Sequence, residues 1–121
     1  MLVIRKEQME LLGLAATKRF AYQASTRLRE LFPEAPLALC PPQLHAWVLD
    51  GIEIARNYEI RREVDVQAFL ELRLHLDEDL LASERLAWVR AFLARTDFTP
   101  RANLDDVYAE VLLRHDRSSH A

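Results

Sequence analysis

The stretch that decides the fold of this chain is Gly51–Leu76, GIEIARNYEIRREVDVQAFLELRLHL. Its first part is typical of the end of one helix, which is followed by a tight turn at Tyr58-Glu59-Ile60. A second helix is predicted over about Arg62–Leu76, with large apolar residues on nearly all of its sides. A helix of this kind must be covered by other segments, so we expect it to be the buried, central helix of a bundle.

Apolar residues at intervals of three or four predict a long first helix over about Arg5–Leu31. This helix should end before Pro33, because proline disfavours helical geometry in the residue that precedes it. A proline-rich connector, PEAPLALCPP at residues 33–42, then leads into a second helix that carries proline in its first turn. The connector is the one substantial loop that the sequence predicts.

Start signals for two more helices follow the central one. Ser83 is a suitable N-cap for the fourth helix, and Thr99-Pro100 is a suitable start for the fifth. Leu, Ala, Arg and Glu dominate the composition and only 2 glycines occur, which favours helices over a sheet. We therefore predict an all-α fold, a compact bundle of five helices in a single domain over residues 1–115, with a disordered tail over residues 116–121.

Composition narrows the class of protein. The formal net charge of −3 argues against a nucleic-acid-binding protein, whose phosphate contacts require a basic surface. The single cysteine, Cys40, rules out an internal disulfide and fits a reducing compartment. No apolar run approaches the length of about 20 residues that a membrane span needs. We expect a cytoplasmic protein without a membrane span.

The residue pattern does not predict an active site or a cofactor site. The best metal candidate is Glu71, His75 and Asp79, which would share one helical face if the helix continued that far. We favour the alternative, in which Gln67, Glu71 and His75 form a solvent-exposed polar strip. The serines lie outside any glycine-rich elbow of the kind that positions a nucleophile. We therefore expect a protein that is not an enzyme, with no catalytic residues, no metal and no cofactor.

Some apolar residues fall outside the main helical stripes. Leu11, Ala15 and Tyr22 lie on a second face of the first helix, and Trp88 lies at the edge of the fourth helix. Tyr and Trp are common anchors in protein interfaces, so these four residues are the candidate partner-binding residues. The alternatives are that other parts of the chain cover them, as the margin of the core, or that the first helix self-associates into a homo-oligomer.

The order and spacing of several short motifs resemble one family. The motifs are Ile4-Arg5-x-x-Gln8-Met9, Leu31-Phe32-Pro33, Gly51-Ile52-x-x-Ala55-x-x-Tyr58-x-Ile60, Glu63-x-Asp65-Val66-x-x-Phe69-x-x-Leu72, Trp88 and Leu104-x-x-Val107-Tyr108. Together they resemble a family of small all-helical bacterial proteins encoded beside spike and effector genes of the type VI secretion system. Family members usually carry Tyr-Gly-Ile at the turn where this chain has Tyr58-Glu59-Ile60.

The resemblance implies a non-enzymatic accessory that binds another protein. The expected role is an adaptor or chaperone for a type VI secretion effector, or for the component that loads the effector onto the spike. The alternative is an immunity protein that binds and neutralises a cognate toxin. Small acidic proteins can be steered electrostatically toward basic toxins, and the net charge of −3 is compatible with this.

Overall fold

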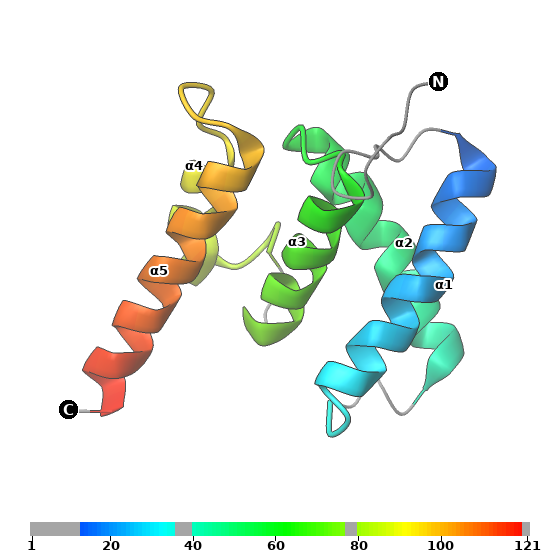
Figure 1. The fold of residues 1–121 in the computed structure, drawn as a ribbon. Coiled ribbons are helices and arrows are strands. Elements are labelled where there is room, and N and C mark those ends of the chain that lie inside the picture. Colours follow the sequence, from blue (N-terminus) through cyan, green and yellow to red (C-terminus); the bar gives the residue numbers. More distant parts are fainter. Residues whose placement is uncertain (1–12, 36–39, 77–79, 120–121) are drawn as a thin grey trace. The chain divides into compact units, whose positions relative to one another are not determined.

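The structure of this protein is a computed structural model that describes residues 13–35, 40–76 and 80–119 (Figure 1). Within those ranges every regular element is a helix, which confirms the predicted all-α fold. The elements are α1 (Leu14–Leu31), α2 (Pro41–Asn57), α3 (Glu63–Leu76), the short 3-10 helix η3 (Glu84–Leu86), α4 (Ala87–Leu93) and α5 (Pro100–Ser119). None of the helices in this described part combines the length and the apolar character that crossing a membrane requires.

The chain divides into two compact units, Met1–Glu71 and Leu72–Ala121. The first unit contains α1, α2 and most of α3, and the second contains the end of α3 with η3, α4 and α5. The single domain expected over residues 1–115 therefore stays a prediction.

The beginning of α1 corrects the predicted first helix. The sequence placed its start near Arg5, but α1 begins at Leu14, directly after Gly13. Gly13 has φ 81° and ψ 165°, a conformation that is accessible to glycine and incompatible with a continuing helix. Residues 5–12 of the predicted helix lie outside the described residues. The predicted end at Leu31 is confirmed.

Helices α1 and α2 pack against each other in the first unit (Figure 1). The start of α2 at Pro41 confirms the prediction of proline in its first turn. A polar contact joins the two helices, because an Nη atom of Arg56 donates a 3.0 Å hydrogen bond to the hydroxyl of Thr17. The apolar residues that the two helices bury are Phe20, Ala21, Ala24, Leu28, Leu44, Val48, Ile52, Ile54 and Ala55.

The turn after α2 has the hydrogen bonds of a Schellman motif. The amide of Ile60 donates to the carbonyl of Ala55 at 2.9 Å, and the amide of Glu59 donates to that of Arg56 at 3.0 Å. Glu59 has φ 62°, the left-handed conformation that this motif requires at the position after the C-cap. The fully buried side chain of Ile60 fits the hydrophobic contact that accompanies the motif. Glycine is the usual residue at the position of Glu59, and Tyr-Gly-Ile in the resembled family would place it there.

Replacing Glu59 with glycine is expected to increase the free energy of unfolding by about 0.5–1 kcal/mol. The left-handed conformation costs a non-glycine residue about 1–2 kcal/mol, and the greater freedom of glycine in the unfolded chain offsets part of the gain. Urea unfolding followed by circular dichroism measures the change. The matched control is Glu53→Gly within α2, which is expected to lower stability by about 1 kcal/mol because its backbone is helical. A loss of stability in Glu59→Gly would contradict the assignment of strain to this residue.

Helix α3 confirms the prediction of a buried helix over about Arg62–Leu76. It begins at Glu63 and ends at Leu76, and four of its apolar side chains are buried. Its carboxylates lie in the first turn and its cations in the last, as the helix dipole favours. Its buried apolar residues are Val66, Phe69, Leu70 and Leu72.

The second unit contains a helical hairpin in which α4 packs against α5 (Figure 1). Ser83 precedes the 3-10 helix η3 and not α4, and its side chain makes no capping hydrogen bond. The predicted start of the fifth helix is confirmed, because α5 begins at Pro100 and the hydroxyl of Thr99 accepts a 3.1 Å hydrogen bond from the amide of Ala102.

Helix α5 extends beyond the predicted end of the fifth helix. The sequence placed that end at His115, whereas α5 continues to Ser119. The disordered tail expected over residues 116–121 stays a prediction. The segment 116–119 contains neither glycine nor proline, so nothing in it breaks the hydrogen-bond pattern of the helix. Residues 120 and 121 lie outside the described residues.

Asn103 of α5 connects the two helices of this hairpin through its buried side chain. Its Nδ2 atom donates to the carbonyl of Arg95 at 3.0 Å and to that of Leu93, the last residue of α4, at 3.4 Å. Its Oδ1 atom accepts a 3.0 Å hydrogen bond from Nε of Arg95. The Arg95 guanidinium lies between the rings of Phe92 and Phe98, at 4.7 and 4.4 Å from their centroids. This cluster fixes the chain between the end of α4 and the start of α5.

Candidate functional site

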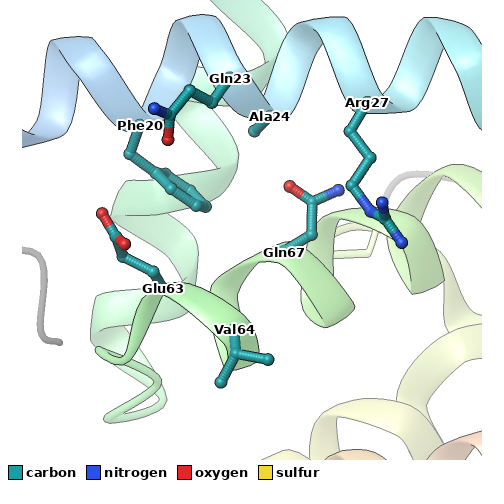
Figure 2. Close-up of a pocket in the computed structure, with 7 residues that line it drawn as sticks. All are labelled: Phe20, Gln23, Ala24, Arg27, Glu63, Val64 and Gln67. Atoms are coloured by element: carbon teal, nitrogen blue, oxygen red, sulfur yellow. The ribbon is translucent and has the colours of Figure 1, made fainter. Parts of the chain in front are cut away.

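A pocket of about 470 Å³ lies between α1 and α3 within the first unit. Figure 2 shows side chains from both helices directed toward the space between them. The pocket combines apolar walls with a carboxylate, a guanidinium and two amides, the mixture that small-ligand and side-chain pockets commonly have. Its lining residues are Phe20, Gln23, Ala24, Arg27, Glu63, Val64 and Gln67.

Glu63 carries the negative charge of the pocket. The residue is only 8% exposed, and among the described residues its carboxylate has no ion pair or hydrogen bond. Figure 2 shows the carboxylate extending from α3 toward α1, next to the ring of Phe20. Its place in the first turn of α3 is favourable for a negative charge because of the helix dipole. The Glu63 side chain is largely withdrawn from water, but its carboxylate oxygens are not among the fully buried unpaired atoms of the described residues, so a cation that reaches them could form a charge-assisted contact.

Arg27 carries the positive charge of the pocket, and its guanidinium lies near the carboxylate of Glu71. Its Nε atom lies 4.0 Å from a carboxylate oxygen of Glu71, on the facing helix. The Arg27 side chain is 59% exposed, so its head is in contact with solvent while its stem lines the pocket. Within the described part of the chain, Glu63 is thus the charged group of the pocket that has no ion pair.

Gln67 supplies a hydrogen-bond donor. Its Nε2 atom is buried, and no acceptor for it is present in the described residues. Figure 2 shows the amide of Gln67 extending from α3 toward α1, between Ala24 and Arg27. A buried donor without an acceptor costs about 1–3 kcal/mol, so a ligand with a carbonyl oxygen would gain from this position.

The predicted partner-binding residues of the first helix lie partly on an exposed surface. Tyr22 is 70% exposed and Ala15 is exposed, whereas Leu11 lies outside the described residues. Leu14, which the sequence reasoning missed, is also 70% exposed. The helical spacing places Leu14, Ala15, Lys18 and Tyr22 within one arc of about 100°. These four residues are the outer face of α1.

Trp88, the fourth candidate, belongs to the second unit and already has partners for its ring. The guanidinium of Arg114 lies 4.2 Å from the ring centroid, and Phe92 packs edge-on at 5.8 Å. The indole is half-buried, which matches the alternative interpretation of Trp88 as part of the core margin. Its role in partner binding stays a prediction.

The candidate metal ligands are not assembled in the described residues. No group of three or more His, Cys, Asp or Glu in that part of the chain could hold a metal ion. Glu71 lies near Arg27, His75 is exposed, and Asp79 lies outside the described residues. The polar strip expected at Gln67, Glu71 and His75 is therefore only partly exposed, because Gln67 and Glu71 are half-buried.

The pocket is the feature that sequence reasoning missed. Periodicity predicts that Gln67 belongs to a solvent-exposed strip, and the sequence assigns Glu63 no role in a site. The available signal was the pairing of two long polar side chains, Glu63 and Gln67, at a spacing of four residues on a helix that is rich in apolar residues. Only the placement of α1 opposite α3 shows that Glu63 and Gln67 line a pocket.

Comparisons with protein-family models, with curated proteins and with solved structures found no match for this chain. The resemblance to the type VI secretion family rests on the order and spacing of the motifs and stays a prediction. The first unit offers two candidate binding surfaces, the outer face of α1 and the pocket between α1 and α3.

Proposed function

We propose that this protein is a non-enzymatic accessory that binds another protein, as an adaptor or chaperone for a type VI secretion effector or for the component that loads it. The observation that supports this proposal is the outer face of α1, where Leu14 and Tyr22 expose most of their surface. The resemblance to proteins encoded beside spike and effector genes supplies the class of partner.

The chemistry of this face suits a protein partner. Burial of a large apolar side chain contributes about 1.5–3 kcal/mol, so Leu14 and Tyr22 together supply a useful part of a binding free energy. Tyr22 adds a hydroxyl that can bond to a partner, and Lys18 adds a charge between the two apolar groups. An exposed apolar anchor flanked by polar groups is typical of the centre of a protein interface.

Replacing Tyr22 with serine is expected to weaken binding to the proposed effector partner by at least about tenfold. The substitution removes an exposed aromatic anchor, and such anchors contribute 2 kcal/mol or more at interface centres. Calorimetry with the purified effector measures the affinity. The matched control is Leu112→Ser on α5, which also replaces an exposed apolar residue and should leave the affinity unchanged. Circular dichroism should show the same helix content in both variants.

Cellular assays separate the adaptor role from the immunity role. Deletion of the gene is expected to abolish export of the effector, and the Tyr22→Ser variant should fail to restore it. Co-expression of the wild-type chain with the effector should not rescue the growth of a target cell. Rescue of growth together with normal export would refute the adaptor proposal and indicate an immunity protein.

A further inference from the structure

We propose that the pocket between α1 and α3 binds an arginine side chain carried on a peptide segment of the protein partner. This inference rests on the proposed function, since it assigns a second contact to the same partner. The Glu63 carboxylate matches the guanidinium of an arginyl residue, the apolar walls match its methylene stem, and the Gln67 amide donor matches its backbone carbonyl.

The negative charge of Glu63 favours a cationic ligand. Glu63 is the group in the pocket whose charge has no partner in the described residues, because Arg27 lies near Glu71. A guanidinium would form a charge-assisted, two-pronged hydrogen bond with the Glu63 carboxylate, which is stronger than a bond between neutral groups. Phe20 lines the same pocket but is only 5% exposed, so it adds an apolar wall beside the carboxylate and not an open face for stacking.

The walls and volume match the rest of the side chain. Phe20, Ala24 and Val64 give apolar surface for the methylene stem of an arginine. A pocket of about 470 Å³ is within the range that binds small ligands, so it holds one long side chain together with part of its backbone.

The amide donor of Gln67 favours a ligand that contains a peptide group. The buried Nε2 atom of Gln67 needs an acceptor, and a guanidinium has only donors. The backbone carbonyl of an arginyl residue supplies this acceptor. A guanidinium compound that lacks a carbonyl is therefore expected to bind more weakly than an arginine within a peptide.

The test is an NMR titration of the full-length, isotope-labelled protein with N-acetyl-arginine N-methylamide. The expected result is saturable shifts of signals from α1 and α3, centred on the side-chain amide of Gln67. N-acetyl-glutamate N-methylamide is the ligand of opposite charge and should produce no saturable shift. Equal responses to the two ligands, or shifts confined to other residues, would overturn the proposal.

Two variants test the two contacts separately. Glu63→Gln is expected to weaken binding of the arginyl ligand by at least about tenfold, whereas Glu30→Gln, the same change on the exposed surface of α1, should have no effect. Gln67→Ala should weaken the arginyl ligand and leave the binding of butylguanidinium unchanged. If Gln67→Ala affects neither compound and the two bind equally, the peptide assignment is wrong.

Failure of the pocket proposal can be distinguished from failure of the proposed adaptor function. If the arginyl ligand fails to bind but effector binding still depends on Tyr22, the pocket proposal is wrong and the adaptor role stands. If the arginyl ligand binds as expected but the effector does not bind, the pocket proposal stands and the adaptor role fails.

Discussion

Replacing Phe69 with alanine is expected to lower the free energy of unfolding by about 3–5 kcal/mol, the usual cost of removing a phenylalanine ring from a packed core. Phe69 is fully buried in α3 and is the largest of the fully buried side chains in the described residues. The loss combines the transfer free energy of the ring with the cost of the cavity that remains. Since the total stability of a domain is about 5–15 kcal/mol, this single change threatens folding at 37 °C.

Urea unfolding of the Phe69→Ala variant can be followed separately in the two units. Trp47 lies in α2 of the first unit and Trp88 in α4 of the second, and the chain has 2 tryptophans. The variants Trp88→Phe and Trp47→Phe each leave one fluorescent reporter. Equal shifts of both midpoints would indicate the single cooperative domain that the sequence predicts, and a shift of Trp47 alone would indicate independent units.

The control for Phe69→Ala is the same change at Phe98, which is 51% exposed. Its contact with the Arg95 guanidinium is of the kind that contributes about 0.5–1 kcal/mol at exposed sites. The expected loss for Phe98→Ala is therefore about 1 kcal/mol or less. If the two variants lose equal stability, the assignment of Phe69 to the core is wrong.

Replacing Asn103 with alanine is expected to lower the free energy of unfolding of the second unit by about 2–3 kcal/mol. The change removes the hydrogen bonds to the carbonyls of Leu93 and Arg95 and the bond from Nε of Arg95. Each such bond contributes about 1 kcal/mol, and a partner group left buried without a bond adds to the loss. The midpoint of unfolding reported by Trp88 fluorescence measures the effect.

Asn57→Ala is the matched control, because Asn57 is exposed at the end of α2. Its expected effect is within about 0.5 kcal/mol. A second comparison is Asn103→Asp, which keeps an acceptor for Arg95 but places a carboxylate against two backbone carbonyls. We expect it to be destabilised as well. A stable Asn103→Asp variant would show that the donor bonds of Asn103 contribute little.

The sequence predicted the helices well where local signals are strong. Pro33 follows the end of α1, prolines open α2 and α5, and the apolar pattern of α3 predicted its burial. These signals depend on the geometry of proline and on the periodicity of apolar residues, which act within a few residues of the chain. The same signals failed at Gly13, where periodicity suggested a continuous helix and the backbone instead adopts a positive φ.

The sequence by itself determined the all-α class, the order of the helices and the identity of most core residues, because helix propensity and apolar spacing are local properties. The tertiary structure alone decided which polar residues lie together. Periodicity cannot show that Glu63 and Gln67 line a pocket opposite α1, or that Asn103 holds the end of α4. Such placements depend on contacts between residues that are distant in the chain, and a one-dimensional pattern carries no information about which helix faces another.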